Sequence, residues 1–131
     1  MQTFALLVTA LLFGGMVLYS FGFAAFLFSA LPAETAGKTI RRAFPHFYLF
    51  VLTCAAVAAA ATWPIDAVGA ALLALVAAST IPTRQALMPA INRATDVGET
   101  TRFKWLHGAS VVITLAHIAM TGLVLARFLP P

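Results

Sequence analysis

The sequence predicts an all-α integral membrane protein, a four-helix up-down bundle with both termini outside and two basic cytoplasmic loops. Of its 131 residues, 62% are hydrophobic and 9% are charged, against about 45–50% and 25% in soluble domains. A chain this short cannot hide so many apolar side chains from water, because its surface is large for its volume. We therefore exclude a soluble enzyme domain, a nucleic-acid-binding module and a disulfide-stapled secreted protein.

Four apolar segments are long enough to cross a bilayer, for which about 20 residues suffice. The first, 3–31, carries no charge and exceeds the hydrocarbon thickness, so its helix is expected to tilt. It lacks the basic start of a signal peptide, so we expect no cleavage. The second, 46–63, follows Pro45, which is expected in the first helical turn. The third and fourth are 65–82 and 105–128, and together the four form one membrane domain.

The ends of the later helices carry recognisable signals. Asp66 is expected to cap the third helix through its carboxylate. Pro82 is expected to interrupt that helix near the membrane surface, where nearby hydroxyls or water can satisfy the freed carbonyl. Gly98 is a C-terminal stop, and Thr100 or Thr101 is expected to cap the fourth helix.

The basic residues predict the orientation. Seven of the eight lie in the first and third loops: Lys38, Arg41, Arg42, Arg84, Arg93, Arg102 and Lys104. The eighth, Arg127, lies in the C-terminal tail. Cytoplasmic loops carry an excess of Lys and Arg. We therefore expect a multi-pass protein of the cell inner membrane, with both basic loops in the cytoplasm.

The first loop has an amphipathic pattern. Ala36, Ile40 and Phe44 recur at helical spacing, while Arg41 and Arg42 occupy another face. This pattern is typical of a helix lying along the membrane interface. A solvated connector with snorkelling arginines is the alternative.

The first helix has a seam of small residues. Gly15, Gly22 and Ser29 are one heptad apart, which predicts close packing of a neighbouring helix along that line. The phenylalanines of this helix are interpreted as packing and lipid-contact residues.

The fourth helix carries a polar stripe at steps of three and four residues: His107, Ser110, Thr114, His117 and Thr121. Such a stripe is costly in lipid, so it is expected to face the bundle interior. In the structural reading, the hydroxyls bond their own helix and His117 bonds across to one partner. In the functional reading, the buried histidine marks a site.

Metal binding is a weaker hypothesis. Candidate ligands are His107, His117 and Cys54, which suit a soft metal, and paired histidines in a helical bundle suit haem. The chain has no tight ligand spacing such as CxxC, so we expect no metal and no cofactor. Apart from Asp66, which is assigned to the cap at the start of the third span, no acidic residue falls inside a predicted span. No nucleophile–base–acid set is apparent, so we expect no enzymatic activity.

Two runs resemble the transmembrane protein 205-like family. The first is Phe44-Pro45-His46-Phe47-Tyr48, and the second is Arg102-Phe103-Lys104-Trp105-Leu106-His107-Gly108-Ala109-Ser110. Thr114-Leu115 stands where that family is expected to have Asn-Leu, which exchanges an amide for a hydroxyl. The resemblance implies a four-span helical membrane protein without established chemistry, some members of which are linked to tolerance of metal-containing drugs.

The resemblance also implies a cluster at the cytoplasmic face. With His107 and Ser110, its members are Phe44, Pro45, His46, Tyr48, Asn92, Arg102, Phe103 and Gly108. A cationic cluster at this depth suits a lipid headgroup or an anionic solute, and locking of the loops onto the bundle is the alternative.

Together these observations predict a non-enzymatic polytopic membrane protein with a small transporter-like or membrane-organising role. The expected partners are membrane lipids and either a second copy or a larger membrane complex, without nucleic acid. Two alternatives stay open, a haem- or metal-binding electron-transfer subunit and an accessory subunit of a larger complex.

Overall fold

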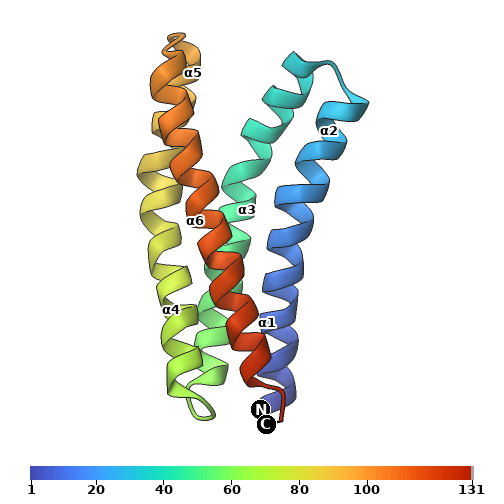
Figure 1. Cartoon of the computed structure of the whole chain (residues 1–131), viewed down its shortest axis with the longest axis vertical. Helices are drawn as coiled ribbons and strands as arrows, with labels where there is room; N and C mark the ends of the chain where they lie inside the picture. Colours follow the sequence, from blue (N-terminus) through green and yellow to red (C-terminus); the bar gives the residue numbers. More distant parts are fainter. Residues whose placement is uncertain (131) are drawn as a thin grey trace.

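Four long helical segments run between the two ends of the molecule and alternate in direction (Figure 1). This computed structural model describes residues 1–130. Each segment is long and apolar enough to cross a membrane. The predicted all-α, four-helix bundle is therefore confirmed, and the chain is a polytopic membrane protein.

The four segments contain eight helical elements. In order, these are α1 (Gln2–Val17), the π-helix η1 (Leu18–Phe23), α2 (Ala24–Ala30), α3 (Ala33–Thr62), α4 (Ala67–Pro82), the π-helix η2 (Thr83–Leu87), α5 (Met88–Asp96) and α6 (Thr100–Arg127). The first segment is α1–η1–α2 and the third is α4–η2–α5. The helices extend beyond the expected spans because much of both basic loops is itself helical.

The segments pack around a square. α1 contacts α3 and α6, and α4 contacts the same two helices from the other side. The start of α1, the α3–α4 connection and the end of α6 lie at one end, while the α2–α3 and α5–α6 connections lie at the opposite end (Figure 1). The two basic regions therefore share one end of the bundle, as the orientation argument requires. Which side of a membrane that end faces stays a prediction.

The core follows the bundle axis. Every helix of the square contributes fully buried side chains, among them Leu12, Met16, Val51, Ala55, Leu73, Val76 and Val124. Small residues let α3 and α4 approach closely, since Ala58 and Ala70 are both buried at this contact-rich pair of helices. In lipid, such close packing replaces the hydrophobic effect as the force that holds helices together.

The first basic loop is a continuation of α3. Residues 33–45 form the first turns of that helix, so neither a separate interfacial helix nor a solvated connector is present. The amphipathic pattern itself is real, because Ala36 is buried while Arg42 is exposed. Arg41 reaches the end of α5 and donates two hydrogen bonds to Asp96, at 2.6 and 2.7 Å. The loop is ordered by this ion pair and by its continuity with the span.

Pro45 and Pro82 both lie within continuous helix. Pro45 is well inside α3, so its expected place in the first turn is wrong. Pro82 ends α4 but does not interrupt the segment, because the π-helix η2 follows directly. Thr83 Oγ1 donates to the Ser79 carbonyl at 2.8 Å. Wider turns and hydroxyl donors are the usual means by which membrane helices accommodate proline.

The π-helix η1 overturns the predicted seam. Gly15 does face α3, where an added Cβ would lie 2.6 Å from the Phe50 ring. Gly22 and Ser29 are exposed instead, and buried Leu27 takes their place. A π-turn contains an extra residue, so η1 rotates every later position by about 100° around the helix axis. The heptad phase is therefore lost between Gly15 and Gly22.

The helix ends agree with the sequence signals in two cases of three. Asp66 caps α4 by accepting a hydrogen bond from the Val68 amide, as predicted. Gly98 has φ +72° and ends α5, as predicted. The expected threonine cap of α6 is wrong: Glu99 occupies the N-cap, and within residues 1–130 no side chain bonds to the freed amides at that position.

Candidate functional site

The centre of the bundle contains a histidine–serine pair. His117 on α6 is 5% exposed, and its Nε2 lies 2.8 Å from the Ser79 hydroxyl on α4. That hydroxyl lies 2.7 Å from the Leu75 carbonyl. The hydroxyl also lies 3.3 Å from the Val76 carbonyl, and which group donates in the His117–Ser79 bond depends on the imidazole tautomer.

A second polar pair joins α3 to α6. The Tyr48 hydroxyl lies 3.3 Å from the Ser110 hydroxyl, and both side chains are buried. The pair joins the second helical segment to the fourth, and so links the first half of the bundle to the second half. Sequence spacing placed Ser110 on an inward face but gave no signal for its partner.

The five residues of the polar stripe differ in how far they are buried. Ser110, His117 and Thr121 are buried and Thr114 is half-buried. Thr114 and Thr121 donate to carbonyls of their own helix, at 3.0 and 2.7 Å. His107 differs, since it is exposed and stacks against Phe103 with ring centroids 5.4 Å apart. The structural reading, in which hydroxyls bond their own helix and His117 bonds one partner, is confirmed for Thr114, Thr121 and His117. It is wrong for Ser110, which bonds Tyr48 on α3, and the expected inward orientation is wrong for exposed His107.

The residues assigned to the cytoplasmic-face cluster form two separate groups. One group lies on α3 and comprises Phe44, Pro45, His46 and Tyr48; the other lies on α5 and α6 and comprises Asn92, Arg102, Phe103, His107 and Gly108. Arg102 pairs with Glu99 on its own helix. Arg84 on η2 lies with its Nε 3.4 Å from the Pro45 carbonyl, and the Tyr48–Ser110 pair is the direct contact between the α3 group and α6. The contacts resemble loop locking more than a single binding site.

The candidate metal ligands are not brought together. Within the described residues 1–130, no three His, Cys, Asp or Glu side chains gather closely enough to hold a metal ion. His117 is bonded to Ser79, His107 lies at the surface, and Cys54 is a half-buried free thiol on α3.

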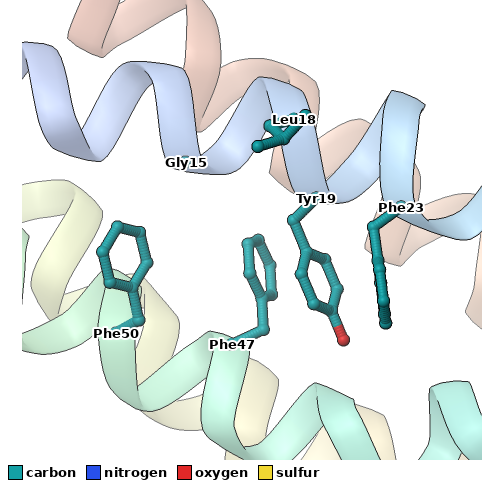
Figure 2. Close-up of a pocket in the computed structure, with 6 residues that line it drawn as sticks. All are labelled: Gly15, Leu18, Tyr19, Phe23, Phe47 and Phe50. Carbon is teal, nitrogen blue, oxygen red and sulfur yellow. The ribbon is translucent and has the colours of Figure 1, made fainter.

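A hollow lies between the first segment and α3. Its lining, which we call the η1–α3 groove, comprises Gly15, Leu18, Tyr19, Phe23, Phe47 and Phe50, around about 330 Å³. Figure 2 shows four of their aromatic rings in a row between the two helices. Leu18 is 70% exposed, so the groove opens on the outer surface of the bundle.

Tyr19 is the centre of this aromatic row. Its ring stacks on Phe47 with centroids 4.2 Å apart, and Phe23 packs on its other side at 5.0 Å. Its hydroxyl is buried and has no hydrogen-bond partner among residues 1–130. Sequence reasoning interpreted the phenylalanines as bulk contacts and missed the groove. The spacing Phe44, Phe47, Phe50 on one helix was the available signal.

The fold and these sites define the class of the protein: a small polytopic membrane protein with paired polar groups inside and an aromatic groove on its surface. The chain belongs to the family described as domain of unknown function DUF4149, which matches residues 7–100. No curated protein and no solved structure matches the chain. The groove lies within the matched range, whereas His117 lies outside it. The resemblance to transmembrane protein 205-like proteins stays a prediction from the two motifs.

Proposed function

We propose that this chain is a non-enzymatic membrane-organising protein of the cell inner membrane, which holds lipids or partner proteins at its surface. The carrying observation is the filled centre of the bundle. Ser110, His117 and Thr121 each bond to another side chain or to their own helix, and the hollow between the first segment and α3 opens on the outer surface. These features favour work at the lateral surface over passage through the middle.

The outer surface supports this role. Large apolar side chains of the first segment are exposed along its length: Phe4, Leu7, Leu11, Leu18, Phe21, Phe26 and Phe28. Such a surface suits lipid, a second copy of the chain or an apolar partner helix. We propose that the protein works without a cofactor and as part of an oligomer or a larger membrane complex.

The orientation is part of the proposal. Both basic regions lie at the end of the bundle opposite the start of α1 and the end of α6. The positive-inside rule assigns that basic end to the cytoplasm. Both termini are then outside.

A transporter-like role is the second candidate, and His117 is the observation that favours it. An ionisable side chain buried in a span is a functional-site hypothesis by default. Reconstitution into liposomes that contain a pH-sensitive dye separates the two roles. We expect wild type and His117→Gln to hold a proton gradient equally well. Leakage through wild type that His117→Gln abolishes would favour transport instead.

Native purification tests the organising role directly. The protein is extracted from its own membrane in a mild detergent and measured by native mass spectrometry and absorption spectroscopy. We expect bound lipid together with a second copy or another chain at fixed stoichiometry, and no haem band. A lone chain without lipid would contradict the proposal, and stoichiometric haem or metal would support the electron-transfer alternative.

A further inference from the structure

The η1–α3 groove has the features of a lipid-chain site. Its volume of about 330 Å³ falls within the range of about 300–1,000 Å³ found for ligand pockets. Its walls are hydrocarbon except for the Tyr19 hydroxyl, and it opens on a helix pair apolar enough to span a membrane. π-Turns are frequent at functional sites, and Leu18, Tyr19 and Phe23 all come from η1. A hydrocarbon chain is the natural occupant.

The same strip of α3 carries polar groups toward the basic end. His46 precedes Phe50 by four residues and Arg42 precedes His46 by four, so helical spacing aligns all three. His46 and Arg42 are exposed. Arg42 lies about 12 Å along the helix from Phe50 at 1.5 Å per residue. This is also about the length of the groove from Gly15 to Phe23, so Arg42 lies at about the depth of the Phe23 end of the groove.

The charge around this strip is mainly positive. No residue from Gln2 to Leu31 is charged, and Glu34 is paired with Lys38 at 2.7 Å. Within residues 1–130, no carboxylate lies within ion-pairing distance of Arg42, whereas the neighbouring Arg41 is paired with Asp96 on α5. A free guanidinium above an apolar groove complements a phosphate joined to an acyl chain.

We infer that the η1–α3 groove binds one anionic phospholipid. Its acyl chain lies along Leu18, Phe47 and Phe50, and its phosphate is bound by Arg42. His46, at the depth between them, offers an N–H donor to the ester oxygens. The site goes beyond the proposed organising role, because it requires one lipid class at one position.

The test uses the purified full chain in mild detergent, titrated with long-chain phosphatidylglycerol or phosphatidylcholine and measured by native mass spectrometry. Wild type is expected to retain phosphatidylglycerol preferentially. Arg42→Gln is expected to weaken that binding about fivefold, which corresponds to about 1 kcal/mol for one basic residue near a membrane surface. Arg93→Gln is the matched control, because Arg93 is exposed on α5 and away from the groove.

A second variant tests the acyl-chain half of the site. Leu18→Trp places a larger, aromatic side chain at the exposed mouth of the groove. It is expected to weaken binding of the long-chain lipid. Gly14→Ala is its control, since an added Cβ there meets nothing within 4 Å among the described residues. Excess glycerol phosphate is expected not to displace the lipid.

Three results would overturn the inference: equal retention of both lipids, equal effects of Arg42→Gln and Arg93→Gln, or displacement by glycerol phosphate. Retained lipid that Leu18→Trp leaves unchanged would also contradict it. A lipid-free monomer would contradict both this site and the organising role. Lipid bound without the Arg42 effect would contradict only the site.

Discussion

The imidazole Nε2 of His117 is hydrogen-bonded to the Ser79 hydroxyl at 2.8 Å, and that hydroxyl lies 2.7 Å from the Leu75 carbonyl. A side chain of the last helix is thereby tied to the backbone of the third segment. This bond satisfies a buried ring nitrogen in the interior of the bundle, where an unpaired polar group is costly.

Removing the serine hydroxyl is expected to destabilise the bundle. Ser79→Ala should lower the free energy of unfolding by about 1 kcal/mol, the order found for hydrogen bonds between membrane helices. Titration of the purified protein from mild detergent into a denaturing detergent measures this loss. Ser29→Ala is the control, because that exposed hydroxyl bonds only the Phe26 carbonyl of its own helix. Equal losses of stability in both variants would argue against the hydrogen bond between His117 and Ser79.

The polar stripe of α6 is expected to respond to leucine according to depth. Ser110→Leu crowds the buried Tyr48 and should cost about 1–3 kcal/mol, as overpacking does. Thr114→Leu should cost less, because Thr114 is only half-buried. Val112→Leu should be nearly silent, since Val112 is 65% exposed. The same unfolding assay ranks the three, and equal tolerance at all three positions would contradict the inward orientation.

Two adjacent glycines of α1 are expected to differ in their response to alanine. Gly14→Ala should raise stability by about 0.5–1 kcal/mol, because alanine restricts the unfolded chain and favours helix. Gly15→Ala should lose that gain, because its Cβ would lie 2.6 Å from the Phe50 ring and push the ring aside. A matched gain in thermal stability for both variants would show that Phe50 does not pack on Gly15.

The ion pair between Asp66 and Arg127 is expected to make stability depend on pH. The Arg127 guanidinium holds the pKa of Asp66 at about 2, below the value of about 3.9 in an unfolded chain. A carboxylate with a lowered pKa stabilises the fold above the unfolded value, and that contribution is lost as the pH falls through the folded value. Between about pH 4 and pH 2, the melting temperature of wild type should therefore fall further than the melting temperature of Arg127→Gln. Parallel curves would contradict the pairing.

The number of membrane-spanning helices and their up-down alternation could be predicted from the sequence, because a segment that crosses lipid must be long and nearly uncharged. The helix ends followed less well. Residues 33–45 and 83–96 are charged or contain proline, yet they continue their helices. Contacts between residues far apart in the sequence order these segments, such as the one between Arg41 and Asp96, which are 55 positions apart. A local sequence pattern does not indicate such contacts.

The site was only partly predictable, because a periodic sequence pattern does not show where a helix gains an extra residue and its faces rotate. The inward positions of Ser110, His117 and Thr121 on the regular helix α6 agreed with a constant spacing. On the first segment, η1 inserts an extra residue, and every face assigned beyond it from a heptad is rotated. The aromatic groove arises at that rotation, which explains why the sequence did not reveal it.

Accessibility labelling of single cysteines tests the central claim most directly, that four spans leave both basic loops on one side. In a Cys54→Ala background, Pro64→Cys probes the α3–α4 connection and Thr95→Cys probes the end of α5. A membrane-impermeant thiol reagent added to intact cells should label the first and not the second. Labelling of both positions from the same compartment would contradict the four-span account.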